Sequence, residues 1–315
     1  MIELLGVFLI SAIISCVLGP LVIKFSRKMR AEQPILHYVD NHTQKSGTPT
    51  MGGIAFILPS AIATLIFQPA QSGAVICAAT MLAFGVVGFL DDFIKVRFRR
   101  NMGLAAYQKI IAQGAICAVV SAYCAFVLNL DKATLPFLGV EISLGGFAFP
   151  FYMLVLLACT NAVNLTDGLD GLAGLTSMVA FVAFGVLIVL DQNVGLATYP
   201  TAVGGALAVF LVANCFPAKI FMGDTGSLAL GGGLGAVAIL SGNTLYLPLI
   251  GLPFVVSALS VIIQVVYFKL SGGKRVFKMA PFHHHLERLG IHENKITFAY
   301  GMVALFVSVL CLIGA

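Results

Sequence analysis

Four short polar segments interrupt an otherwise apolar sequence, and their acids and histidines are of the types that bind metals and phosphates. The segments contribute Asp91 and Asp92, Asp167 and Asp170, Asp224, and His283, His284 and His285. Protein Mg²⁺ sites often use one or two carboxylates and leave the other positions to phosphate oxygens and water. Lys or His can stabilise developing negative charge. Together the segments indicate Mg²⁺-dependent phosphoryl chemistry.

The first segment, GFLDDFIKV, places two adjacent carboxylates at the end of an apolar stretch. Near a hydrocarbon boundary such carboxylates are costly unless they are paired, hydrated or functional. On a helix, Lys95 can pair with either Asp91 or Asp92. The two acids therefore either fix the depth of a helix end or accept a proton or a cation.

The second segment, TNAVNLTDGLDGLAG, repeats polar residues at intervals of three: Asn161, Asn164, Asp167 and Asp170. If the helix persists, they form a slowly drifting polar stripe on one face. The alternative is helix capping combined with packing of small residues. Two amides and two acids at the end of an apolar stretch favour a polar binding site.

The third segment, FPAKIFMGDTGSLALGGG, contains Asp224 in a glycine-rich turn, and we expect a helix to begin after Gly226 and Ser227. The amino end of a helix binds anions through its free N–H groups. Asp224 beside such a site is a plausible Mg²⁺ ligand, and the alternative is a simple helix cap. Phe221 either stacks on a base or belongs to the core.

The fourth segment carries the three histidines between Pro281 and Gly290, a spacing that predicts a short helix of about nine residues. Successive helical side chains point about 100° apart, so one or two imidazoles, not all three, enter the site. No zinc spacing accompanies them, and an anion-binding role is favoured.

Two lysines are further candidates for phosphate binding. Lys45 lies in the loop before GTPTMGG, and Lys109 opens a later apolar stretch. Each either binds a phosphate or flanks a membrane helix.

The elements that must position these residues are membrane helices. The chain is 59% hydrophobic and 10% charged, whereas a soluble domain is about 25% charged. The apolar runs are too long and unbroken for barrel strands, and runs of about 20 residues cross a bilayer as helices. We therefore predict an all-α integral membrane protein with a single domain, residues 1–315. Its ten predicted spans are 2–23, 52–68, 74–94, 110–129, 147–165, 172–190, 199–217, 227–241, 245–268 and 296–313.

The basic residues predict the orientation of these spans. Of the 18 Lys and Arg residues, all except Lys132 follow odd-numbered spans. Because cytoplasmic loops are enriched in Lys and Arg, both termini are expected to be extracytoplasmic, and the four polar segments then meet at the cytoplasmic face. Glu3 is the only charge before Lys24, so the first span lacks the basic start of a signal peptide.

Five motifs carry a resemblance to a known family. They are KSGTPTMGG (45–53), FLDDFIK (89–95), NLTDGLDGLA (164–173), FMGDTGSLALGG (221–232) and FKMAPFHHHLE (277–287). In this order, on ten spans, the chain resembles the phospho-N-acetylmuramoyl-pentapeptide transferases of the polyprenyl-phosphate N-acetylhexosamine-1-phosphate transferase superfamily. The resemblance implies that UDP-MurNAc-pentapeptide and undecaprenyl phosphate react, with Mg²⁺, to give lipid I and UMP in peptidoglycan biosynthesis.

The resemblance also implies roles for individual residues. Asp91 matches the residue proposed to deprotonate the lipid phosphate, Asp92 its essential neighbour, and Asp224 the Mg²⁺ ligand. Asn161, Asp167 and His283 match further residues needed for activity. Residues matching the substrate-binding set are Lys45, Thr50, Lys109, Asn164, Asp170, Asn214, Phe221, Met222, His284 and His285. Within that set, Phe221 is expected to stack on uracil.

The implied setting is the bacterial cytoplasmic membrane, with membrane lipid as a partner, a homodimer as the assembly and no nucleic acid. The nearest alternative is a sister enzyme that transfers GlcNAc-1-phosphate to a polyprenyl phosphate. A transporter would instead place ionisable groups near mid-membrane on discontinuous helices, often in internal repeats. The acids here lie at helix ends and no repeat is visible. Direct attack by the lipid phosphate and a two-step route through an aspartyl-phosphate both fit these residues.

Overall fold

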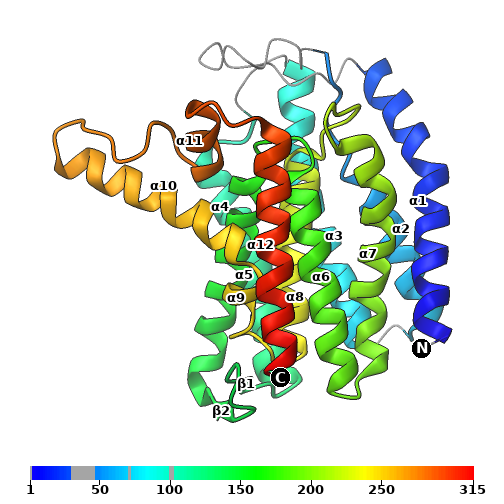
Figure 1. The fold of residues 1–315 in the computed structure, drawn as a ribbon. Helices are drawn as coiled ribbons and strands as arrows, with labels where there is room; N and C mark the ends of the chain where they lie inside the picture. The colour runs from blue at the N-terminus through cyan, green and yellow to red at the C-terminus, as the bar shows by residue number, and fades with distance from the viewer. Residues whose placement is uncertain (1, 30–46, 70–71, 99–102) are drawn as a thin grey trace.

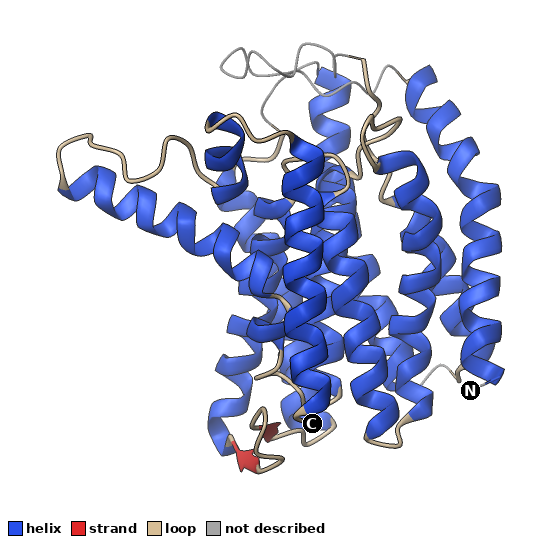
Figure 2. Ribbon diagram, in the orientation of Figure 1, coloured by secondary structure: helices blue, strands red, loops and turns tan. Residues whose placement is uncertain are grey.

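Helices make up almost all the regular structure of this protein. The computed structural model describes residues 2–29, 47–69, 72–98 and 103–315. The longer helices are α1 (Ile2–Lys28), α3 (Gly73–Phe98), α4 (Ala106–Ala122, continued by a π-helical turn at Tyr123–Val127), α5 (Ala148–Thr166), α6 (Leu172–Leu190), α7 (Val194–Asn214), α8 (Gly223–Leu240), α10 (Leu252–Leu270) and α12 (Glu293–Ile313). Shorter elements are α2 (Ile54–Phe67), α9 (Leu247–Ile250), α11 (Phe282–Arg288) and the antiparallel pair β1 (Lys132–Thr134) and β2 (Glu141–Ser143) (Figure 2).

Nine helices of the described chain are long and apolar enough to cross a membrane, which confirms an integral membrane protein. The remaining predicted span corresponds to α2, which has 14 residues and rises only about 21 Å, against a hydrocarbon core of about 30 Å. Its predicted start at residue 52 is wrong for a physical reason. The N–H groups of Gly52 and Gly53 donate to the carbonyls of Phe221 and Met222, at 2.9 and 3.0 Å, so the helix begins only at Ile54.

Helix α8 lies at the centre of the bundle, and 89% of its 18 residues are buried. Its glycines explain how neighbouring helices approach so closely. A Cβ at Gly231 would contact the backbone of Thr160 on α5, and one at Gly232 would contact the ring of Phe84 on α3. Small residues permit this kind of packing between membrane helices, where backbones come close together.

The described chain begins and ends at the same end of the molecule, the lower end in Figure 1, where the β1–β2 pair also lies. At the opposite end lie α11 and the connection that follows α5. Helix α10 departs from the bundle and runs obliquely outward before the chain returns to α11 (Figure 1). The four polar segments lie at the end of α3, after α5, at the start of α8 and on α11, and so at one end of the bundle.

The end of α5 and the start of α8 show where the predicted helices agree with the structure and where they differ near these segments. Helix α5 ends at Thr166, one residue after the predicted end at 165, and Asp167 and Asp170 lie in the turn that follows. The helix therefore does not persist far enough to place all four polar residues on one face. Helix α8 begins at Gly223 rather than after Ser227, so the glycine-rich segment forms its first turn. The first turn of α8 donates hydrogen bonds to Asp92 of α3, a contact between distant segments that explains the earlier start of this helix.

Gly88 offers a test of the α3–α8 packing. A Cβ at this position would contact the backbone carbonyl of Asp224, and overpacking typically costs about 1–3 kcal/mol. We expect Gly88→Ala to lower the melting temperature of the detergent-solubilised protein. Gly114→Ala on α4 is the matched control, because no heavy atom lies within 4 Å of the added Cβ and alanine favours a helix. Equal melting temperatures for the two variants would contradict this account of the packing.

Candidate active site at the ends of α3, α5 and α8

The site is organised by Asp92, which lies near the end of α3 and is almost fully buried. Its carboxylate accepts hydrogen bonds from the N–H of Asp224 at 3.2 Å and the N–H of Thr225 at 2.9 Å, in the first turn of α8. The Thr225 hydroxyl donates to it as well, at 2.7 Å. The anion at this helix start is therefore a side chain from α3, which satisfies N–H groups that a helix leaves free.

Asp91 is fully buried and faces the same space from the neighbouring position on α3. Its Oδ1 accepts the N–H of Leu104 at 2.7 Å. Its Oδ2 lies 2.6 Å from the Lys95 ammonium and 3.0 Å from that of Lys109 on α4. The sequence prediction that Lys95 pairs with either acid is confirmed, because Lys95 also lies 3.8 Å from Asp92.

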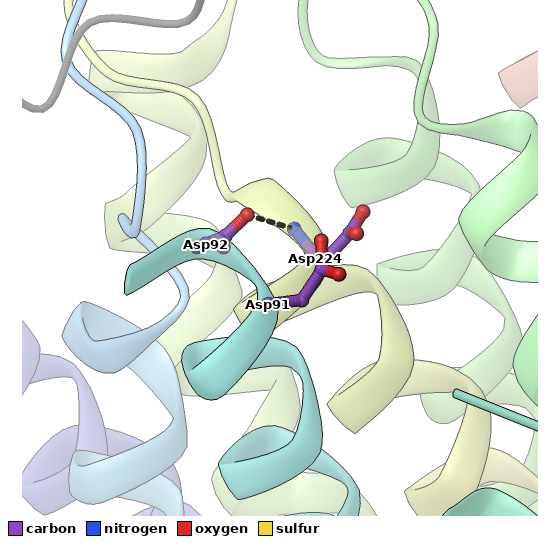
Figure 3. A group of neighbouring side chains, drawn as sticks. All are labelled: Asp91, Asp92 and Asp224. Atoms are coloured by element: carbon purple, nitrogen blue, oxygen red, sulfur yellow. Dashed lines mark hydrogen bonds between the residues drawn. The ribbon is translucent and has the colours of Figure 1, made fainter. Parts of the chain in front are cut away.

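Asp224 completes the acidic group from the start of α8 (Figure 3). Its Oδ1 accepts the Asn164 amide at 2.9 Å, and its Oδ2 accepts Lys95 at 2.9 Å and Lys109 at 2.6 Å. One oxygen from each of the three aspartates lies within 4.8 Å of the others. A set made only of carboxylate oxygens suits a hard cation such as Mg²⁺, so Asp91, Asp92 and Asp224 fit a metal site.

Helix α5 supplies two amides beside this group. Asn164 donates to the Ser227 hydroxyl at 2.8 Å as well as to Asp224. One turn earlier, Asn161 donates to Gln113 at 2.8 Å and to the backbone carbonyl of Leu157. Each of these amide groups uses its nitrogen for protein contacts, which fixes the direction in which its carbonyl oxygen points.

The turn after α5 holds two further acids in different surroundings. Asp170 is buried and accepts the N–H of Ala218 at 2.9 Å, while its backbone carbonyl accepts the Thr297 hydroxyl. Asp167 is half-buried. Loss of hydration, together with the negative charges of Asp224, Asp92 and Asp170, raises the pKa of Asp167 to about 8. Asp167 is therefore mostly protonated at neutral pH and can donate a hydrogen bond.

The histidine helix α11 confirms that the three imidazoles do not share one environment. His283 is fully buried, and burial together with the adjacent His284 lowers the pKa of His283 to about 3, so it is neutral. A Cβ at Gly168 would contact His283, which places this imidazole against the turn after α5. His284 pairs with Glu287 at 2.8 Å.

His285 contacts a different part of the chain from the other two histidines. Its Nδ1 accepts the backbone N–H of Lys278 at 3.1 Å, and its ring packs against Phe277 and Phe282. These contacts fix the return from α10 to α11. The described contacts of His285 are therefore with the connecting segment, whereas His283 and His284 border the turn that contains Asp167.

The remaining predicted binding residues surround the segment before α8. Asn214 is buried and donates to the Ile220 carbonyl at 2.9 Å. The N–H of Phe221 donates to Pro49 at 2.8 Å, and its side chain is half-buried. Met222 and Thr50 are buried. A Cβ on Gly223 would meet Thr50 and Asp92, so Thr50 lies next to the acidic group.

The structure thus brings Asp91, Asp92, Asp224, Asn164 and Lys109 into one connected group. Met222 is completely buried in the hydrophobic core, where its side chain packs. Lys45 lies outside the described residues. The other predicted residues lie around this group on α5, the turn after it, α11 and the segment that leads into α8.

Three contributors were not predicted as site residues. Lys95 was considered only as a helix neighbour of the two acids, Thr225 only as part of a turn, and Gln113 was not considered. Gln113 is buried on α4, four residues after Lys109, and so lies on the same helical face. A polar residue one turn from a predicted phosphate ligand, within an apolar helix, is the signal that would have found it.

Comparison with known proteins agrees with this geometry. A family model described as glycosyl transferase family 4 matches residues 74–242. The first signature of the phospho-N-acetylmuramoyl-pentapeptide-transferases matches residues 45–57. The first match contains the three clustered aspartates, and the second contains the glycines that pair with the segment before α8.

Three relatives bear the name phospho-N-acetylmuramoyl-pentapeptide-transferase. That of Thermoanaerobacter sp. (strain X514) is 42% identical over 302 residues, which cover 96% of this chain and 95% of the relative. That of Clostridium botulinum (strain Eklund 17B / Type B) is 40% identical over 325 residues, covering 99% and 97%. That of Desulforamulus reducens is 43% identical over 321 residues, covering 97% and 94%.

The similarity extends over nearly the whole of each pair of chains, and the apolar helices agree with a multi-pass protein of the bacterial inner membrane. The chain belongs to the phospho-N-acetylmuramoyl-pentapeptide transferase family.

Proposed function

We propose that the protein transfers phospho-MurNAc-pentapeptide from UDP-MurNAc-pentapeptide to undecaprenyl phosphate, which gives lipid I and UMP in peptidoglycan biosynthesis. The observation that carries this proposal is the group of three aspartates and two lysines, in a chain about 40% identical to its relatives over almost their full length. A soluble nucleotide sugar and a membrane lipid both reach such a group when it lies at the ends of membrane helices.

We further propose ten membrane crossings within a single domain, residues 1–315, with α2 as the shortest crossing. The described chain begins and ends at the same end of the bundle, which supports an even number of crossings (Figure 1). The distribution of Lys and Arg supports extracytoplasmic termini and an active site at the cytoplasmic face. The family also suggests that two copies of the chain assemble as a homodimer.

Asp224, with Asp91 and Asp92, would hold the Mg²⁺, and the bound metal would neutralise diphosphate charge during transfer. In the proposed reaction, a lipid phosphate oxygen forms a bond to the phosphorus that carries the sugar, and the bond from that phosphorus to UMP breaks. Asp91 accepts the proton of the lipid phosphate. Lys109 stabilises the negative charge on the phosphates as the bond to UMP breaks.

The substrate-binding assignments follow the surroundings of the acidic group. We propose that Phe221 stacks on uracil and that Lys45, Asp170 and Asn214 complete the nucleotide pocket. The half-buried position of Phe221 supports a ring that contacts both protein and ligand. A direct transfer and a route through an aspartyl-phosphate use the same acids.

The amide of Asn164 contacts Asp224, and His283 and His284 border the turn that contains Asp167. We assign activity to Asn161, Asp167 and His283, and substrate contacts to Thr50, Asn164, His284 and His285, whereas the burial of Met222 in the core argues against a substrate contact there. Neutral His283 can donate a hydrogen bond to a phosphate oxygen without adding charge.

The substrate is tested by UMP release from purified protein supplied with undecaprenyl phosphate, Mg²⁺ and either UDP-MurNAc-pentapeptide or UDP-GlcNAc. We expect UMP only with the muramoyl substrate. UMP only with UDP-GlcNAc would assign the protein to the sister activity. No UMP from either, with protein that elutes as a single folded species, would overturn the proposed transfer reaction.

Asp224→Asn removes a carboxylate charge at nearly unchanged size. We expect turnover to fall below detection, because metal binding and the ion pairs with both lysines depend on this charge. Turnover and its Mg²⁺ dependence are the measurements. Asp191→Asn is the control, since Asp191 contacts Asn243 beyond the far end of α6 and should keep its activity. Near-normal activity of Asp224→Asn would argue against the metal assignment.

Asp91→Asn tests the proton acceptor. We expect kcat to fall by at least about 10²-fold, the usual contribution of general base catalysis, with little change in nucleotide affinity. Binding of UMP and steady-state kinetics separate the two effects. A change confined to KM would show that Asp91 acts in substrate binding and not as the base.

A further inference from the structure

We infer that Lys95 is an exchangeable counter-ion of the three aspartates, and that its ammonium leaves them for the substrate phosphates when a divalent cation binds. Metal and nucleotide should therefore bind in a positively coupled manner. This inference rests on the proposed function, and it adds Lys95 to the residues that handle substrate.

Two oxygen atoms carry the argument. Asp91 Oδ2 lies 2.6 Å from the Lys95 ammonium, and Asp224 Oδ2 lies 2.9 Å from it. Lys109 contacts the same two oxygens, at 3.0 and 2.6 Å. The two lysines therefore share one pair of carboxylate oxygens.

The other oxygens of the three carboxylates already have partners. Asp91 Oδ1 accepts the N–H of Leu104, and Asp224 Oδ1 accepts the amide of Asn164. Both oxygens of Asp92 accept hydrogen bonds from the first turn of α8. Asp91 Oδ2 and Asp224 Oδ2 are each contacted by two ammonium groups, so a cation that binds either of these oxygens must displace an ammonium.

The charges of these groups make a divalent cation and the ammonium groups compete for the carboxylates. Three carboxylates and two ammonium groups carry a formal charge of −1, and a divalent cation would change it to +1 with like charges in contact. The lysine side chains are 20% and 25% exposed, so water screens this repulsion only partly. A nucleotide phosphate removes the conflict, because it supplies negative charge to the ammonium that leaves.

The position and the flexibility of Lys95 suit this exchange. It lies within the last turn of α3, where its side chain is partly exposed. Its four-carbon stem is flexible and carries a compact charge. A lysine that stays on the carboxylates would behave differently, since its removal would leave the effect of UMP on metal binding unchanged.

Mn²⁺ binding to the full-length protein in detergent micelles tests the exchange. Paramagnetic resonance measures free Mn²⁺ with and without UMP, and a titration of Mn²⁺ with UMP alone gives the baseline. For the wild type we expect UMP to tighten Mn²⁺ binding. For Lys95→Gln we expect Mn²⁺ alone to bind about tenfold more tightly, within the usual range of coupling between sites, and UMP to add less.

Lys132→Gln is the matched control, because Lys132 is exposed and pairs with Glu141 in the β1–β2 pair. It should bind Mn²⁺ as the wild type does. Lys109→Gln is the second variant, since it frees the same two oxygens. It should also tighten Mn²⁺ binding but keep the effect of UMP, because Lys95 is still present. If Lys95→Gln does not fold, loss of the UMP effect in Lys109→Gln would overturn the inference.

Unchanged or weaker Mn²⁺ binding by the folded variant, or no effect of UMP on the wild type, would overturn the inference. Release of UMP from UDP-MurNAc-pentapeptide by the wild type tests the proposed function separately. An active wild type whose Lys95→Gln variant gains no affinity for Mn²⁺ would contradict the exchange and leave the function standing. An inactive wild type with the expected Mn²⁺ pattern would contradict the function alone.

Discussion

The structure depends on one interaction, the carboxylate of Asp92 bound to the first turn of α8. A buried carboxylate and a buried helix start are each costly alone, and each satisfies the other here. The contact holds Asp224 beside Asp91, because Asp224 is itself one of the residues whose N–H is bound. The acidic group is therefore a direct result of how α3 meets α8.

The packing of α8 supports this interaction along the rest of its length. Glycines at 231 and 232 bring α5 and α3 close to the central helix, and Gly88 does the same at the level of the site. The pairing of Gly52 and Gly53 with Phe221 and Met222 fixes the segment that enters α8. Rigid surroundings of this kind let a small number of polar residues hold their geometry within an apolar protein.

Much of this arrangement could be predicted from sequence, because apolar length and motif composition are local properties. The helical membrane class and the short histidine helix were predicted and are confirmed. The pairing of Lys95 with the aspartates followed from helical spacing alone. These features require no knowledge of which helices are neighbours.

The incorrect predictions all concern contacts between distant segments. The sequence indicated an anion site at the amino end of α8 but not which anion occupies it, and the structure shows the carboxylate of Asp92 from α3 there. The start of α2 was placed by apolar pattern, whereas the hydrogen bonds of Gly52 and Gly53 decide it. Gln113 was missed because its partner, Asn161, lies on another helix.

The separation of Asp92 from Asp224 also has a consequence for synthesis of the chain. Their contact joins residues 132 positions apart, so a ribosome needs on the order of ten seconds to make the second after the first. During that interval α3 has no α8 to bind its carboxylates. Lys95, on the same helix, supplies the charge that the acids need while the nascent chain enters the membrane.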